Sequence, residues 1–169
     1  MTWAILLPQP TDAGRSALKM MTPRKPIEVA RLIASGRWKS KHIASYREQF
    51  GDDVFLDVLL CAFVDDCSME SLTHFDCQQT CGKLLLEIMP ETDRPLRPMI
   101  RKSLAFWNPS VEEWPFFLCR RFGIGVVSEL IDQIAATDTL NETEQRAVQT
   151  FRYWLRAKSY TILGAAPPG

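Results

Sequence analysis

The sequence predicts an all-α protein with a single helical domain, and three features of the chain lead to this prediction. Apolar residues recur at intervals of three and four along most of the chain, which is the period of an amphipathic helix. Prolines, glycines and short polar breaks divide these segments into about seven to nine helices. Apart from residues 3–7, no stretch alternates apolar and polar residues as a strand does. Short connections make consecutive helices antiparallel neighbours.

The first three predicted helices are bounded by proline and glycine. Pro26 suits a first helical position, and Gly36 marks the end of the helix that it begins. A second amphipathic segment ends at Gly51. Asp52 and Asp53 then open a third helix, because carboxylates are favoured by the positive end of the helix dipole.

The middle of the chain predicts a long helix from about Met69 to Met89, where Pro90 ends it. Residues 94–107 are also helical in pattern, with both of their prolines confined to the first turns. A short helix follows over residues 126–136.

Two later helix starts carry the spacing of a capping box. Ser110 and Glu113 have this spacing, but Pro115 follows closely, so that the regular helix begins there or is kinked. Asn141 and Glu144 repeat the spacing and begin the last predicted helix.

Composition bounds the class of protein. The chain has 169 residues, of which 46% are hydrophobic and 24% charged, as in an ordinary globular protein. Residues 1–26 form an irregular lead-in, residues 27–160 the helical domain and residues 161–169 a flexible tail. No apolar run approaches the roughly 20 residues of a membrane span, and residues 3–7 are too short for a signal peptide. We therefore expect no membrane partner. Without a signal peptide, the odd number of cysteines, five, favours free thiols in a reducing cytoplasm.

Charge is balanced overall and segregated along the chain. Lys plus Arg and Asp plus Glu each total 20, which argues against a protein whose whole surface binds nucleic acid. Residues 15–47 are basic, residues 48–93 acidic and residues 94–121 basic again. Such blocks indicate either neighbouring helical layers that attract each other at their edges, which we favour, or a docking face for a charged partner.

The acidic block supplies the first set of candidate partner-binding residues. They are Asp52, Asp53, Asp57, Asp65, Asp66 and Glu70. The run lacks the glycine and alternating oxygen ligands of a calcium loop. A solvated acidic face is the ordinary interpretation, and a face that mimics nucleic acid and blocks a basic toxin is the functional one.

The basic segment admits an interpretation as a nucleic-acid site, because basic residues around an aromatic can track phosphates and stack a base. It contains Arg31, Arg37, Trp38, Lys39, Lys41, His42 and Arg47. Trp38 belongs, however, to the apolar stripe of Tyr46 and Phe50, and the total charge is balanced. An ordinary solvated face is therefore favoured, and nucleic acid is disfavoured as a partner.

His74, Cys77 and Cys81 are spaced three and four apart and share one face of the predicted helix. Imidazole and thiolate suit zinc, so these residues are the candidate ligands of a metal or the site of a thiol-dependent enzyme. A structural zinc site usually has a fourth ligand, and the spacing is not that of paired CxxC motifs. We favour the alternative that both cysteines are small apolar core residues, with no cofactor.

Cys119 and two tryptophans are the remaining candidates. Cys119 precedes a pair of arginines whose charges could lower a thiol pKa, but we expect it to pack among the neighbouring phenylalanines. Trp107 and Trp114 flank the break at residues 108–110. An exposed tryptophan at such a break would anchor a protein partner, because binding energy concentrates in Trp, Tyr and Arg.

Two segments resemble parts of small bacterial HEAT-like proteins. The first is Leu32-Ile-Ala-Ser-Gly-Arg-Trp38, followed by Tyr46 and Phe50. The second is Glu113-Trp-Pro-Phe-Phe-Leu-Cys-Arg-Arg-Phe-Gly123, followed by Val126, Val127 and Leu130. The resemblance covers roughly residues 27–158 and implies antiparallel helix pairs in an α-solenoid-like domain. It implies a protein-binding function and transfers no specific residue.

The expected function is therefore a non-enzymatic protein-binding module. The resemblance implies more specifically a bacterial immunity or antitoxin protein that neutralises a cognate toxin, such as a nuclease or another effector domain, by direct binding. Two alternatives stay open: a metal- or thiol-dependent enzyme that uses His74, Cys77 and Cys81, and a regulatory module that binds nucleic acid.

Overall fold

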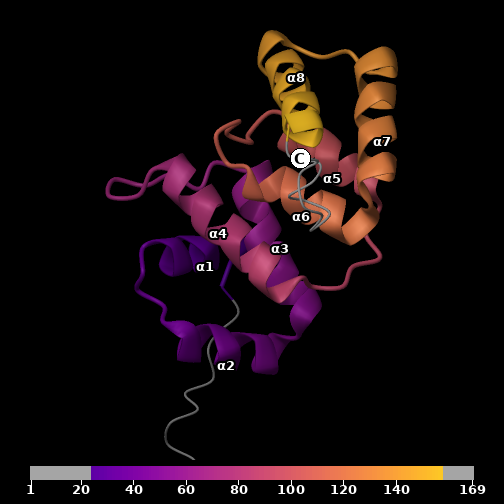
Figure 1. Ribbon diagram of the computed structural model, residues 1–169. Helices are drawn as coiled ribbons and strands as arrows, with labels where there is room; N and C mark the ends of the chain where they lie inside the picture. The colour runs from indigo at the N-terminus through magenta and orange to yellow at the C-terminus, as the bar shows by residue number, and fades with distance from the viewer. Residues whose placement is uncertain (1–23, 158–169) are drawn as a thin grey trace, which may run out of the picture.

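The computed structural model describes residues 24–157, which form eight α-helices and no strand (Figure 1). The helices are α1 (Pro26–Ala34), α2 (Ser40–Phe50), α3 (Asp52–Val64), α4 (His74–Ile88), α5 (Leu96–Ser103), α6 (Glu113–Phe122), α7 (Ile124–Thr137) and α8 (Glu142–Ala157). The all-α prediction is thus confirmed for this part of the chain. Among these helices, none has both the length and the hydrophobicity that crossing a lipid bilayer requires.

The ends of the predicted domain lie mostly outside the described residues. This holds for most of the predicted lead-in and for all of the predicted tail at 161–169. Pro26 is the first residue of α1, as expected for a proline whose missing N–H no helical bond needs. Gly36, Gly51 and Gly123 have φ of 68°, 85° and 92°, a conformation that glycine adopts without steric cost at the end of a helix.

The prediction that a helix begins at Met69 is wrong, because α4 begins at His74. The Thr73 hydroxyl accepts a hydrogen bond from the backbone N–H of Asp76 at 3.1 Å, and the Asp76 carboxylate accepts one from the N–H of Thr73 at 3.4 Å. This reciprocal capping makes Thr73 the N-cap, so that the helix begins at the next residue and does not extend back to Met69. The preceding residues form a loop in which Met69 and Leu72 make an isolated β-bridge.

The predicted capping box at Ser110 and Glu113 does not form. Helix α6 starts at Glu113 with Glu112 as its N-cap, and no side chain caps it. Pro115 then falls in the first turn, where backbone N–H groups have no helical partner to lose. Helix α5 is also shorter than its predicted span of 94–107.

The predicted box at Asn141 and Glu144 is confirmed. The Asn141 side chain accepts a hydrogen bond from the N–H of Glu144 at 3.0 Å, and the Glu144 carboxylate accepts one from the N–H of Asn141 at 3.0 Å. This cap begins α8, the last helix of the described chain.

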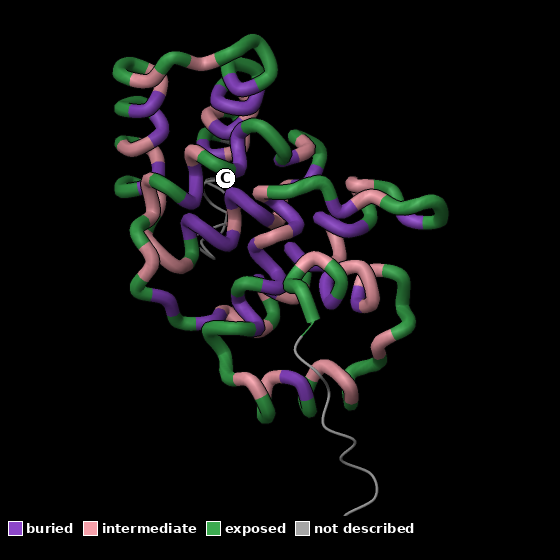
Figure 2. Tube along the Cα trace, turned by 180° about the vertical axis from the view of Figure 1, so that it is seen from behind, coloured by how far each residue is buried: buried purple, intermediate pink, exposed green. Residues whose placement is uncertain are grey.

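Helix α3 lies at the centre of the fold and packs against α1, α2, α4 and α5. Seven of its residues are buried, and Figure 2 shows buried positions concentrated in the middle of the molecule. Helix α4 packs on α1, α3 and α6, and α7 and α8 continue the packing from α6. The core is therefore continuous from α1 to α8, as its set of buried contacts also shows.

Helices α4 and α6 approach each other closely over the core. A Cβ atom added at Gly82 would lie 2.7 Å from the Cβ of Glu113, so that this position tolerates no side chain. Next to it, the rings of Phe63 and Trp114 stack with their centroids 4.7 Å apart. The Trp114 indole N–H donates to the Ser103 hydroxyl at 3.0 Å, so its polar atom is satisfied in the core.

An ionic cluster joins α5 to the start of α8. The Arg101 guanidinium donates to the carboxylate of Glu144 and lies 3.3 Å from that of Asp138, which also pairs with Arg97. The residue Glu144 is only 6% exposed. Its hydrogen bond with Arg101, opposed by burial, lowers the pKa of the Glu144 carboxyl below its usual range.

This cluster predicts a pH-dependent contribution to stability. Because the pKa of Glu144 is lowered by folding, its contribution is present above the unfolded pKa of about 4.3 and disappears as the pH falls through the folded value. We expect Glu144→Gln to lower the free energy of unfolding on the order of 1 kcal/mol at pH 7, and much less at pH 3. Urea denaturation at both pH values measures the difference.

Glu142→Gln, an exposed position two residues earlier in α8, is the matched control and should change stability by less than about 0.5 kcal/mol. If Glu144→Gln lowered the free energy of unfolding equally at pH 3 and pH 7, the conclusion that Glu144 stabilises the fold through its negative charge would be contradicted.

Candidate functional site

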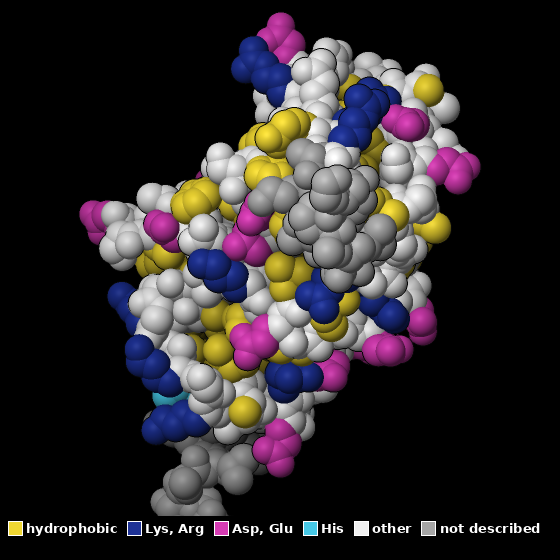
Figure 3. Space-filling view, in the orientation of Figure 1, with side chains coloured by type: hydrophobic (Ala, Val, Ile, Leu, Met, Phe, Trp, Pro, Cys, Tyr) yellow, Lys and Arg dark blue, Asp and Glu magenta, His cyan; other side chains and the backbone are white. Residues whose placement is uncertain are grey.

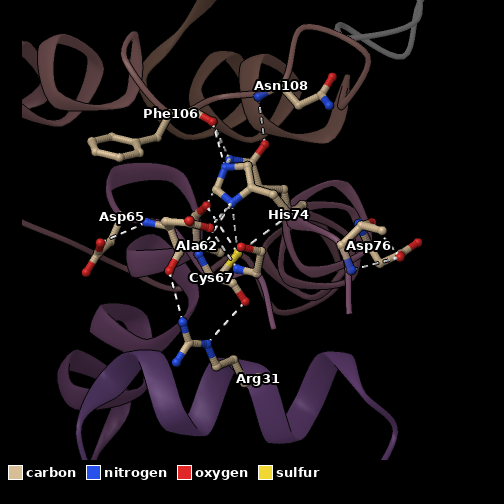
Figure 4. A network of polar contacts seen from close by, with 12 residues as sticks. Arg31, Ala62, Asp65, Cys67, His74, Asp76, Phe106 and Asn108 are labelled. Carbon is tan, nitrogen blue, oxygen red and sulfur yellow. Dashed lines mark hydrogen bonds and ion pairs between the residues drawn. The ribbon is translucent and has the colours of Figure 1, made fainter. Parts of the chain in front are cut away.

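Figure 4 shows the polar network around the predicted metal site, where His74 lies between Cys67 and the backbone of Phe106. The Gln78 side chain of α4 is 0% exposed and donates to the carbonyls of Ala62 and Phe106, both at 2.9 Å. Its own oxygen accepts a hydrogen bond from the N–H of Asn108 at 2.7 Å. Ala62 is in the last turn of α3, where carbonyls lack a helical partner. One side chain thus caps α3 and holds the α5–α6 connection.

His74 extends this network to the loop after α3. Its Nε2 lies 2.7 Å from the carbonyl oxygen of Phe106 and 2.7 Å from the side-chain nitrogen of Gln78. Both amide hydrogens of Gln78 already bind carbonyls, so the Nε2 of His74 donates to Phe106. Its Nδ1 lies 3.3 Å from the Cys67 sulfur and 3.6 Å from the Asp66 carboxylate. The contact with Cys67 raises the pKa of His74, and the partial burial of the ring opposes this rise.

Arg31 of α1 completes the network from the other side. Its guanidinium donates to the carbonyl of Cys67 at 3.2 Å and to that of Asp66 at 3.1 Å. The loop between α3 and α4 is therefore held by α1 and α4 together. Arg31, a member of the predicted nucleic-acid segment, has a structural role here.

The three predicted metal ligands are not brought together as ligands. His74 contacts Cys67, which was not one of the three predicted ligands, and Cys77 and Cys81 are buried in the core. Within residues 24–157, no three His, Cys, Asp or Glu side chains are placed so that they would hold a metal ion.

Contacts within the core raise the pKa values of two buried thiols, those of Cys67 and Cys77. Contact with the thiol of Cys77, together with burial, raises the pKa of Cys67 well above its usual range. For Cys77 the contact with Cys67 lowers the pKa, but contact with Cys81 and burial outweigh it and the pKa is raised. Since the thiolate is the nucleophile and the metal ligand, these sulfurs have core roles in this conformation.

Cys119 is also a core residue, with an exposed fraction of 3%. Burial raises the pKa of its thiol to about 12. The hypothesis that the following arginines lower this pKa is therefore wrong. Arg121 lies instead 3.5 Å from the carboxylate of Glu91.

The half-buried thiol of Cys61 lines an apolar cavity of about 330 Å³ between the start of α1, α3 and α5. The rim of this cavity carries the ion pair of Asp57 and Arg94, and Lys102 lies nearby. Burial raises the pKa of the Cys61 thiol, and the neighbouring thiols raise it further. The acid that lines the cavity, Asp57, is paired with Arg94, and its charge raises the thiol pKa instead of lowering it.

The acidic candidates fall into two groups at opposite ends of α3. Asp52 and Asp65 are thirteen positions apart, which corresponds to about 20 Å at 1.5 Å per residue, and Asp57 lies between them, about 12 Å before Asp65. At the first end, Asp52 pairs with Arg47 at 2.8 Å and Asp57 pairs with Arg94. The carboxylate of Asp53 enters none of the ion pairs found among residues 24–157.

The second acidic group lies in the loop after α3. The carboxylate of Asp65 accepts the N–H of Asp66 at 2.8 Å, and that of Asp66 accepts the N–H of Ser68 at 2.9 Å. The hydrogen bonds from Ser68 lower the pKa of Asp66. Glu70 is exposed next to Met69, whose exposed fraction is 39%. These acids shape a turn, and Asp65 and Glu70 form no ion pair with the residues that the structure describes.

The two candidate tryptophans are not surface anchors. Trp114 is 0% exposed and Trp107 is 3% exposed. The Trp107 indole donates to the carbonyl of Val111 at 2.9 Å, and its ring packs 4.8 Å from that of Phe151. The condition on which their predicted role depended, exposure at the chain break, is therefore not met.

Gln78→Ala should destabilise the fold strongly. The substitution leaves the carbonyl of Ala62 and the N–H of Asn108 without this partner, whereas the carbonyl of Phe106 keeps its hydrogen bond from His74. A buried polar group without a hydrogen bond costs about 1–3 kcal/mol. We expect the free energy of unfolding to fall by about 2–4 kcal/mol in urea denaturation. The loss is limited because a water molecule that enters the vacated space can bind some of the backbone groups. Gln133→Ala, at an exposed position of α7, is the control and should be nearly neutral. A loss below 1 kcal/mol would show that Gln78 does not hold this network.

Thiol labelling tests the assignment of the cysteines to the core. In the native protein at pH 8, Cys61 should react first with a disulfide reagent, because it is the half-buried one. The other four thiols should react at least about tenfold more slowly, and all five should react at once in denaturant. Fast native labelling of Cys77 or Cys119, or one equivalent of zinc in protein purified without chelator, would return the enzyme alternative.

Comparisons of the chain with protein-family models, with curated proteins and with solved structures found no match. The function is therefore argued from the contacts, burial and charges described above.

Proposed function

We propose that this chain is a non-enzymatic protein-binding module and, more specifically, an immunity-type or antitoxin-type protein that neutralises a toxin by direct binding. The observation that supports this proposal is the division of labour among its polar residues. Those that the sequence offered for chemistry are engaged inside the fold, while unpaired charge of each sign is gathered on separate parts of the surface.

The interior supports the proposal through His74 and the cysteines. The imidazole of His74 contacts the carbonyl of Phe106 and the sulfur of Cys67. The thiols of Cys67 and Cys77 have raised pKa values. A nucleophile needs a lowered pKa or an adjacent base, and a base needs access to a substrate. The described contacts give these groups a role in stability instead.

The surface supports the proposal through its unpaired charge. Lys and Arg side chains gather over α1 and α2, at the lower left of Figure 3. Arg37, Lys39 and Lys41 take part in none of the ion pairs formed within residues 24–157. Uncompensated charge on a rigid body steers a partner of opposite sign and suppresses wrong partners.

The acidic loop belongs to the same proposal. Asp65 and Glu70 have no ion-pair partner among the described residues, so a basic toxin is the kind of protein that would contact them. The HEAT-like arrangement is also part of the proposal. It is supported by the packing of successive helices, α3 on α4, α6 on α7 and α7 on α8, by which repeat pairs bury their apolar faces.

A pull-down tests the proposed function. The full chain, tagged at one end and expressed in the cell it comes from, should recover one protein partner in a 1:1 ratio. Addition of the purified chain should then abolish the toxicity or the enzymatic activity of that partner, with an end point at one equivalent.

The salt dependence of the interaction gives a second test of this proposal. The interaction should weaken between 50 mM and 500 mM NaCl, because exposed charges are screened over a shorter distance at high salt. Failure to recover a partner, or a partner whose activity is unaffected at one equivalent, would contradict the proposal.

A further inference from the structure

A groove opens between the start of α2 and the outer side of α4. Its lining residues are Ile33, Trp38, Lys39, Ser40, Ile43, Thr80, Lys83 and Leu84. Helix α2 packs against α3, whereas α4 packs against α1, α3 and α6, so that α2 and α4 flank a hollow of about 340 Å³. This volume is near the lower end for ligand sites, about 300–1,000 Å³, and suits a short segment with one or two apolar side chains.

The floor of the groove is apolar. Ile33 is 4% exposed, and Trp38, Ile43 and Leu84 are half-buried and pack against the core. Covering such surface yields roughly 25 cal/mol per Å² of apolar area removed from water. An apolar side chain of a partner therefore has a place to insert.

The rim of the groove is cationic. Lys39 at the start of α2 and Lys83 on α4 are exposed, and no acidic residue lines the groove. Neither lysine takes part in the ion pairs found in the described part of the chain. The hydroxyls of Ser40 and Thr80 add donors beside them. Two unpaired lysines beside an apolar floor are complementary to carboxylates that flank an apolar side chain.

We propose that this groove binds an acidic segment of the partner protein, with an apolar side chain inserted over Trp38, Ile43 and Leu84 and flanking carboxylates at Lys39 and Lys83. The inference rests on the proposed function, because it names the chemistry of the partner that the module binds. It assigns a docking site of opposite charge to the acidic loop after α3.

Aromatic packing favours a peptide over a nucleic acid. A base stacks on the free face of an aromatic ring, but Trp38 packs against Tyr46 and His42, with centroid distances of 5.4 and 6.4 Å. The rest of the floor is aliphatic, and only two lysines line the groove, which is little charge for following a phosphate backbone.

Selection from a random library of 12-residue displayed peptides tests the assignment. The full chain is the bait, and the variant Lys39→Glu/Lys83→Glu is the counter-selection. We expect the enriched peptides to place Asp or Glu on both sides of a Leu, Ile or Phe. The tightest peptide, measured by fluorescence anisotropy, should lose at least about tenfold in affinity to the double variant.

Lys102→Glu, an exposed lysine on α5 outside the groove, is the matched control and should bind the peptide as the unmodified chain does. Ile43→Ser should also weaken binding, because it removes apolar floor without changing charge. Circular dichroism melting of each variant separates loss of the groove from loss of the fold.

Three results would overturn the assignment. The first is enrichment of neutral or basic peptides only, or of peptides that bind the double variant equally well. The second is displacement of the peptide by a dT12 oligonucleotide at lower concentration than by the unlabelled peptide. The third is concentration-dependent dimerisation in sedimentation that the double variant abolishes, which would make a second copy the occupant, through its own acidic loop with the exposed Met69.

The pull-down separates this inference from the proposed function. A partner that is recovered and neutralised equally by the double variant overturns the groove assignment and leaves the protein-binding function in place. Absence of any partner, with acidic peptides still selected at the groove, overturns the neutralising function alone.

Discussion

The fold depends on one buried amide. Gln78 binds the carbonyl at the end of α3 and two backbone groups of the α5–α6 connection, and two of these three groups, the Ala62 carbonyl and the Asn108 N–H, have their hydrogen bond from this side chain. His74 repeats the link to Phe106, and Arg31 holds the neighbouring loop from α1. These contacts join residues 16 to 36 positions apart, so the central helices, the loop after α3 and the α5–α6 connection have to be in place together.

This constraint also explains why residues with chemical potential become structural ones. The imidazole and the thiols lie where the chain reverses direction between α3 and α4, and the reversal needs polar groups to cover exposed backbone ends. Burial and thiol–thiol contact then keep the sulfurs protonated. Reactivity is suppressed by the same packing that makes the central helices rigid, and a rigid helical body is what presents a fixed surface to another macromolecule.

The alternating charge blocks are largely used between neighbouring helices and turns. The ion pairs that show this are Arg47–Asp52, Arg94–Asp57, Arg101–Glu144 and Arg152–Asp132. Such pairs at the edges of packed helices confirm the ordinary interpretation of the blocks for much of the described surface. The start of α2 differs, because Arg37, Lys39 and Lys41 take part in none of the ion pairs within residues 24–157. Charge left over beside an apolar groove is the feature from which a binding function is inferred.

Sequence alone determined the class of the fold and those helix ends that depend on nearest neighbours. Pro26, Gly51 and the Asn141–Glu144 box act within one turn, so the helix ends that they set can be predicted from neighbouring residues in the sequence. The start of α4 was missed, since the box that sets it, Thr73 with Asp76, competed with a helical pattern that extended to Met69.

Only the tertiary structure decided what the candidate residues do. The pairing of His74 with Cys67, the burial of Trp107 and Trp114, and the division of the acids between two ends of α3 follow from how the helices pack. Neither spacing nor composition encodes these contacts, because exposure and charge pairing are properties of residues brought together from distant parts of the chain.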